Sequence, residues 1–247
     1  MTICVTGGTG FLGTHVVRAL AERGEDVRVL VRDRARMSNL AGTRAIPHEG
    51  DVLDAGSLRR AFRGCDAVMH VAGVVGSSER AWRVNAQSPE VAVAAAAAEG
   101  VRRVVLTSSV VAIGPQPDGQ LGTEDDPYRA GALGLVYLDS KHEGEARALA
   151  AALHHDVDLV VVNPAYVLGA PVDRSSPGES SARRVLDFLA GRMPAILDAP
   201  TNVVDVRDVA IAHVLALDRG QRGERYIAGG HNVMWRDVVE RAQAVSG

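Results

Sequence analysis

The chain has 247 residues, of which 47% are hydrophobic and 23% charged, and its formal net charge is −3. This composition suits one globular domain, and it lacks both the basic surplus of a nucleic-acid-binding protein and a membrane-spanning run of roughly 18 apolar residues. Two cysteines without metal-ligand spacing, and an N-terminus without a signal-peptide pattern, indicate a cytoplasmic protein with no metal site.

Strand and helix patterns alternate through the first half of the chain. Short apolar runs bounded by turn residues predict strands, and apolar residues at helical spacing predict the helices between them. The predicted order is strand 2–6, helix 11–23, strand 27–31, helix 34–40, strand 44–47, helix 55–62, strand 67–71, helix 79–99 and strand 103–108. Strands joined by helical crossovers predict an α/β fold with a doubly wound parallel sheet and helices on both faces.

The second half is less regular. Glycines and prolines predict a long loop over 110–135, and long loops in compact domains are often functional. The patterns that follow predict helix 135–153, strand 158–162, a Pro/Gly/Ser-rich flap over 170–180, helix 181–190, helix 206–217, strand 225–227 and helix 234–245.

A glycine-rich turn joins the first predicted strand to the first helix. The run Gly7-Gly8-Thr9-Gly10-Phe11-Leu12-Gly13 has the spacing G-x-x-G-x-x-G. Glycines here permit positive φ and let backbone N–H groups approach a pyrophosphate at the helix N-terminus. In the first strand–turn–helix of a repeating β/α chain, this motif predicts a dinucleotide-binding Rossmann-type fold. The cofactor site should include Gly7, Gly10, Phe11, Leu12 and Gly13.

The end of the second strand indicates which dinucleotide is bound. An acidic residue there binds a ribose 2′-hydroxyl, whereas a basic residue accommodates a 2′-phosphate. This strand runs into Arg32, with Arg36 close behind, and Asp33 comes one position late and is expected to pair with the arginines. We therefore expect NADP(H) rather than NAD(H), with Arg32 and Arg36 in the site. The alternative is that these arginines are surface residues of a short helix.

The chain's single lysine, Lys141, follows Tyr137 by four residues, while every other residue of the 27 Lys+Arg is arginine. Residues four apart share one face of a helix. A phenol beside a compact ammonium predicts a tuned general acid, in which Lys141 lowers the pKa of Tyr137 and holds the nicotinamide ribose. The alternative is an accidental surface lysine. The neighbouring His142 is expected on the solvated face.

Ser109, the glycine turn and Tyr137-Leu-Asp-Ser-Lys141 together resemble the short-chain dehydrogenase/reductase superfamily. The glycine spacing is similar to that of its extended branch, and Val-Arg-Asp after the second strand to that of its dihydroflavonol-reductase-like members. The resemblance covers nearly the whole chain and implies that Ser109, Tyr137 and Lys141 are catalytic. It also implies cofactor contacts from Asp51, Val52, Ala72, Gly73, Asn85, Lys141, Pro164 and Val167.

Two departures from the family pattern bear on the substrate. Extended members usually have a larger C-terminal substrate lobe, so we expect a single NAD(P)-binding domain over 1–247 with a small lobe from segments 168–204 and 220–247. This makes a nucleotide sugar a less expected substrate. In addition, Val110-Val111 follow the serine where sugar dehydratases of this group carry Asp-Glu, which argues against dehydration.

These observations predict an NADPH-dependent reductase that transfers a hydride to a ketone or aldehyde of a small organic molecule, for example a flavonoid- or polyketide-like compound. One alternative is an NAD-dependent sugar epimerase of the same superfamily. Another is a non-catalytic NADP(H)-sensing protein, although such proteins commonly lack the Tyr–Lys pair. The expected partner is the small-molecule carbonyl substrate, and a homodimer through the Tyr137/Lys141 helix is an open possibility.

Overall fold

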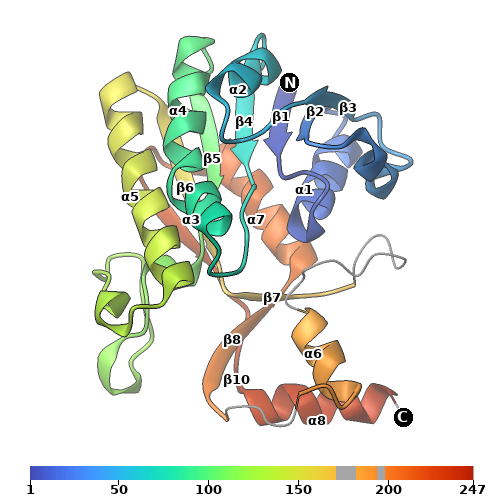
Figure 1. Cartoon of the computed structure of the whole chain (residues 1–247), viewed down its shortest axis with the longest axis vertical. Coiled ribbons are helices and arrows are strands. Elements are labelled where there is room, and N and C mark those ends of the chain that lie inside the picture. Colours follow the sequence, from blue (N-terminus) through green and yellow to red (C-terminus); the bar gives the residue numbers. More distant parts are fainter. Residues whose placement is uncertain (171–181, 194–197, 247) are drawn as a thin grey trace.

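The computed structural model describes residues 1–170, 182–193 and 198–246. Its main feature is a seven-stranded sheet with the order β3-β2-β1-β4-β5-β6-β9 (Figure 1). All neighbouring strands in it are parallel. The strands are β1 (Thr2–Thr6), β2 (Asp26–Val31), β3 (Ile46–Glu49), β4 (Ala67–His70), β5 (Arg103–Thr107), β6 (Asp158–Pro164) and β9 (Arg225–Ala228). The predicted doubly wound α/β fold is therefore confirmed.

Helices cover both faces of this sheet (Figure 1). One face carries α1 (Phe11–Glu22) and α7 (Val206–Arg219), with the short 3₁₀ helix η1 (Arg34–Leu40) beside α1. The other carries α2 (Ala55–Phe62), α3 (Glu79–Ala86), α4 (Ser88–Ala98) and α5 (Val136–His155). No helix in the described part of the chain is both long and apolar enough to span a bilayer.

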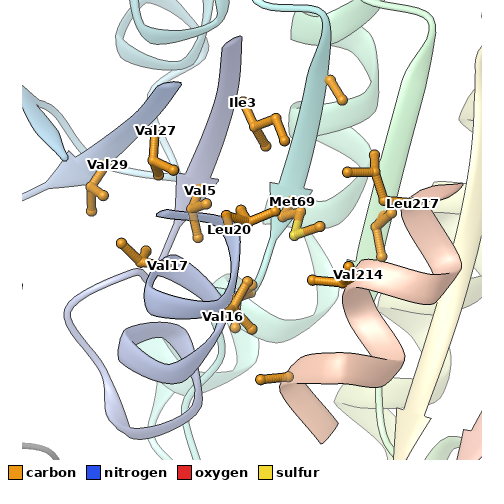
Figure 2. Close-up of a cluster of buried hydrophobic side chains, with 14 of the residues drawn as sticks. Ile3, Val5, Val16, Val17, Leu20, Val27, Val29, Met69, Val214 and Leu217 are labelled. Carbon is orange, nitrogen blue, oxygen red and sulfur yellow. The ribbon is translucent and has the colours of Figure 1, made fainter. Parts of the chain in front are cut away.

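Alternation along the strands builds a core on each side of the sheet. Ile3 and Val5 of β1 pack toward α1 and α7, whereas Cys4 between them packs toward α2 and α4. Figure 2 shows the first of these clusters, in which Leu20 of α1 and Val214 of α7 approach the same strands. A strand buried on both faces reads as a continuous apolar run, which is why the sequence identified these strands well.

The predicted single helix 79–99 is wrong, because the structure has two helices, α3 and α4, that meet at Gln87. Pro89 explains the break. It has no N–H to donate to the carbonyl of Asn85, and its ring would collide with that carbonyl in a continuous helix. The proline instead occupies the first turn of α4, where the missing donor costs nothing.

The sequence patterns also missed a second, three-stranded sheet with the order β10-β8-β7. It consists of β7 (Tyr166–Leu168), β8 (Pro200–Asp205) and β10 (His231–Met234), and it lies with α6 (Ala182–Leu189) and α8 (Trp235–Ser246) at the bottom of Figure 1. Strand β8 begins with proline and contains asparagine and aspartate, which are depleted in strands. The predicted flap 170–180 lies, apart from its first residue, outside the described residues.

Smaller differences concern boundaries. The third strand is Ile46–Glu49 rather than 44–47, and the predicted loop 110–135 contains three short 3₁₀ turns at Val110–Ala112, Pro117–Gly119 and Ala130–Leu133. Otherwise the segment between β5 and α5 is irregular, as predicted.

Candidate active site

A cleft of about 640 Å³ opens at the carboxyl edge of the large sheet. It spans the ends of β1 and β4, the neighbouring strands at which the strand order reverses, and such switch points are where open α/β sheets bind ligands. The cleft is lined by nearly all of the predicted site residues, namely Gly7, Gly10, Phe11, Leu12, Gly13, Arg32, Arg36, Val52, Ala72, Gly73, Ser109, Tyr137, Lys141, Pro164 and Val167.

The glycine turn lines this cleft. Gly7 has a φ of +69°, and a Cβ placed on it would lie 2.7 Å from the Cα of Ala72 on the facing β4 turn. A Cβ on Gly13 would collide with the carbonyl oxygen of Gly7. The N-cap residue of α1 is Gly10, which has no side chain to cap the helix, and no other side chain among the described residues does so. The first N–H groups of the helix are therefore left for an anion in the cleft, so these residues fit the pyrophosphate of a dinucleotide.

Arginines line the cleft at the end of β2. Arg32 and Arg36 are exposed, and within the described part of the chain neither forms an ion pair. The predicted pairing of Asp33 with the arginines is wrong, because its carboxylate accepts from the N–H of Ala35 at 2.9 Å and caps η1. Arg34 instead pairs with Glu49, at 3.3 Å, away from the cleft. Two cations therefore remain available to a ligand phosphate.

Asp51, a predicted cofactor contact, does not line the cleft. Its carboxylate lies 2.7 Å from the guanidinium of Arg80, a cleft residue on α3 that the sequence did not single out. Burial raises the pKa of Asp51, but hydrogen bonds from Arg80 and from the N–H of Leu53 outweigh it and lower that pKa overall. Asp51 thus holds Arg80 at the cleft wall. The sequence contains many arginines, so it gave no indication that Arg80 has this position.

Asn85, the other predicted contact outside the lining, supports the cleft from behind. Its side chain is buried, accepts from the N–H of Val74 at 3.0 Å and donates to the carbonyl of the same residue at 2.8 Å. It also donates to the hydroxyl of Ser140 on α5 at 3.2 Å. Asn85 therefore ties the turn after β4 to the helix that carries Tyr137 and Lys141.

Ser109, Tyr137 and Lys141 all line this cleft. Lys141 is 8% exposed, and its ammonium donates to the carbonyl of Thr107, at the end of β5, at 3.2 Å. A Cβ on Gly73 would lie 3.2 Å from the lysine Nζ, so the glycine permits close approach. Ser109 follows β5, and its hydroxyl donates to the carbonyl of Pro164 at 3.4 Å and lies close enough to the Tyr137 phenol to lower the pKa of that group. The phenol, hydroxyl and ammonium thus converge from two elements that are distant in sequence.

Burial governs the protonation of both α5 groups. It raises the pKa of Tyr137, although the hydrogen bond from Ser109 opposes this. It lowers the pKa of Lys141 to about 8, against the attraction of the Glu145 carboxylate. The predicted lowering of the Tyr137 pKa by Lys141 is therefore not found. At neutral pH the phenol keeps its proton, which suits a general acid better than a general base.

The loop 110–135 is clamped onto α5 by Tyr128, which the sequence did not identify. Its hydroxyl donates to the carboxylate of Asp139 at 2.6 Å, and its ring stacks on His142 with centroids 4.1 Å apart. The His142 ring is held in turn by a 3.1 Å hydrogen bond between its Nδ1 and the carbonyl oxygen of Ala112. The expectation of a solvated His142 is therefore wrong. The signal that was missed is long-range, because Tyr128 and its partners lie in separate elements.

A family model described as the NAD dependent epimerase/dehydratase family matches residues 3–229. The chain belongs to this family. Among its relatives is a Synechocystis sp. protein provisionally named a dihydroflavonol 4-reductase, 37% identical over 98% of this chain and 72% of its own length. Another is cinnamoyl-CoA reductase 1 of Oryza sativa, 35% identical over 92% of this chain and 71% of the relative.

Solved structures of the family agree with this assignment. UDP-glucose 4-epimerase of Thermus thermophilus, in complex with NAD, superposes with a TM-score of 0.81 at 27% identity, covering 100% of this chain and 84% of the epimerase. The resemblance to the extended short-chain dehydrogenase/reductases is confirmed, as is the prediction of an NAD(P)-dependent enzyme acting on carbonyl or hydroxyl groups. The family includes both reductases and epimerases, so it leaves cofactor and reaction to be argued from the site.

Proposed function

We propose that this protein is an NADPH-dependent reductase that acts on a ketone or aldehyde of a small organic substrate. The observation that carries the proposal is the convergence of Ser109, Tyr137 and Lys141 in one cleft with the uncapped N-terminus of α1. The two reductase relatives support the reaction, because both are named for the reduction of carbonyl compounds. We propose that the substrate is bound by the lobe segments 168–204 and 220–247, together with the loop 110–135.

Each residue has a role that its surroundings support. The glycine turn and the start of α1 would hold the pyrophosphate, Arg32 and Arg36 the 2′-phosphate, and Lys141 the nicotinamide ribose. NADPH supplies the hydride when bound. Ser109 donates a hydrogen bond to the substrate carbonyl oxygen as negative charge develops there, and the Tyr137 phenol gives that oxygen its proton.

A test of the cofactor uses Arg32→Glu, with Arg34→Glu as the matched control because Arg34 pairs with Glu49 outside the cleft. We expect Arg32→Glu to weaken NADPH binding by roughly 10- to 100-fold and to leave NADH binding little changed, because only NADPH carries the 2′-phosphate. Fluorescence titration of both nucleotides measures this. Equal loss for the two nucleotides, or equal effects of the two substitutions, would contradict the NADP assignment.

The pH dependence follows from burial of the two α5 groups. Carbonyl reduction needs protonated Tyr137 and charged Lys141, so its rate should hold at neutral pH and fall as pH rises through the Lys141 pKa of about 8. Alcohol oxidation needs the phenolate, and because burial raises the Tyr137 pKa it should be slow at neutral pH and accelerate with pH. Initial rates in both directions between roughly pH 6 and pH 10 test this. A reduction rate that climbs steadily across this range would be incompatible with the acid role of Tyr137.

The alternative of an NAD-dependent epimerase is favoured by the family's name and by the NAD-bound epimerase structure. Assays with a panel of carbonyl compounds, beginning with a dihydroflavonol and cinnamoyl-CoA, distinguish a reductase from an epimerase and from a sensing protein. A reductase oxidises added NADPH in proportion to the carbonyl reduced. An epimerase retains NAD and interconverts sugar nucleotides without net oxidation of nucleotide, and a sensing protein binds NADPH but oxidises none of it.

A further inference from the structure

A buried carboxylate lies on α5 one helical turn beyond Lys141. Glu145 is only 4% exposed, and with Tyr137 and Lys141 it occupies every fourth position, so the three share one face of the helix. A buried carboxylate is costly unless its oxygens are paired. The partners of Glu145 therefore indicate its structural role.

Both carboxylate oxygens of Glu145 have partners. One lies 3.1 Å from the guanidinium of Arg225 at the start of β9, and the other accepts from the side-chain amide of Asn163 on β6 at 2.8 Å. Asn163 is fully buried, so this hydrogen bond has no competition from water. The carboxylate thus joins α5 to the two last strands of the large sheet.

The same partners reach the candidate active site. The Asn163 amide also donates to the carbonyl oxygen of Ser109 at 3.0 Å, and Arg225 donates to the carbonyl of Asp126 at 3.3 Å. Two residues along β9, the N–H of Ile227 donates to the carboxylate of Glu124 at 2.9 Å. Glu145 is therefore the centre of a network that ends at the proposed catalytic serine on one side and at the loop 110–135 on the other.

Glu145 is also the carboxylate that acts on Lys141. The groups facing the lysine are Tyr137 on its own helix, Asn85 of α3, the carbonyl of Thr107 at the end of β5, and His70 of β4. Burial, together with the lysine's charge, lowers the pKa of His70 to about 3, so this imidazole is neutral. Within the described residues, the negative charge that balances the buried ammonium therefore comes from Glu145.

We propose that Glu145 is a positioning residue that places its negative charge one helical turn from the Lys141 ammonium and, through Asn163 and Arg225, holds Ser109 and the loop 110–135 in place relative to it. The catalytic consequence rests on the reductase function proposed above. The electrostatic part does not, because it concerns one ammonium and one carboxylate of the same helix.

The single lysine makes a direct test possible. Protein grown with ¹³Cε-labelled lysine has only the Lys141 signal, so its chemical shift followed against pH reports the protonation of that one group. We expect wild type to titrate near pH 8, and Glu145→Gln to titrate about one unit lower because the ammonium loses its nearby opposite charge. The matched control is Glu143→Gln on the same helix, which removes a half-exposed carboxylate paired with Arg147 and should leave the titration unchanged.

A second variant covers the case in which Glu145→Gln fails to fold because Arg225 is left without its partner. The double variant Glu145→Gln/Arg225→Gln removes both charges, and neutral replacement of a whole buried pair is generally tolerated. Its Lys141 signal should also titrate below that of wild type. A titration equal to wild type in whichever of these variants folds would overturn the proposal.

Kinetics then connect the charge to catalysis. In Glu145→Gln, the pH at which carbonyl reduction slows on the alkaline side should shift to a lower pH, by the same interval as the NMR titration of Lys141. A purely structural loss would instead lower the rate equally at all pH values. A rate profile that does not shift, beside a titration that does, would overturn the catalytic part of the proposal. If wild type reduces no carbonyl compound, the reductase function fails, and the NMR titration still decides the role of Glu145.

Discussion

Replacing Tyr137 by phenylalanine should reduce turnover by roughly 100- to 10,000-fold while leaving NADPH binding almost unchanged. The substitution removes one oxygen, the group from which the substrate would take its proton, and retains the ring that lines the cleft. Ser109 would still polarise the carbonyl, so some activity should remain. The measurement is kcat on the best substrate of the carbonyl panel, with the NADPH dissociation constant determined on the same preparation.

Tyr226→Phe is the matched control for this experiment. Tyr226 lies on β9, is partly exposed, and its hydroxyl accepts from the N–H of Gln221 at 2.9 Å, away from the cleft lining. It should keep wild-type turnover. Wild-type kcat in Tyr137→Phe would show that the proton comes from another group, and a loss of NADPH affinity as large as the loss of turnover would show that the tyrosine serves binding instead.

The parts of the site that the sequence predicted are those encoded locally. Gly7 to Gly13 stand in one turn, and Tyr137 and Lys141 stand one helical turn apart, so spacing alone was enough to place them together. The buried parallel strands were equally readable, because both of their faces are apolar. The sign of the pKa shift of Tyr137 was not readable, because it depends on burial by elements that are distant in sequence.

The parts that were missed depend on long-range contacts. Arg80 is one of many arginines in the sequence, and its place at the cleft depends on its ion pair with Asp51. Glu145 is one of many acidic residues, and its buried position depends on its contacts with Arg225 and Asn163. Strand β8 has a polar composition and forms because neighbours from both sides pair with it. Pairing across 20 or more residues leaves no periodic trace in a single sequence.

Replacing Gly7 by alanine should weaken NADPH binding by about 100-fold or more. Two effects combine at this position. The residue has a φ of +69°, which strains any side chain, and its new Cβ would lie 2.7 Å from both the Cα and the N of Ala72. The turn can relieve that overlap only by moving away from β4, and this displaces the N–H groups that would face the pyrophosphate. NADPH fluorescence titration measures the loss.

Gly24→Ala is the control that separates the effect of backbone strain from the effect of steric overlap with a neighbouring residue. Gly24 has a similar φ of +80°, but it lies at the far end of α1 and a Cβ there would meet nothing within 4 Å. Backbone strain should cost about 1–2 kcal/mol of unfolding free energy in both variants, the overlap with Ala72 should add to this cost in Gly7→Ala, and only Gly7→Ala should also lose the cofactor. Thermal or urea unfolding of Gly24→Ala measures the cost of strain alone. If Gly7→Ala bound NADPH as tightly as Gly24→Ala does, the close approach of the turn to β4 would have no part in cofactor binding, and the placement of the dinucleotide over α1 would have to be abandoned.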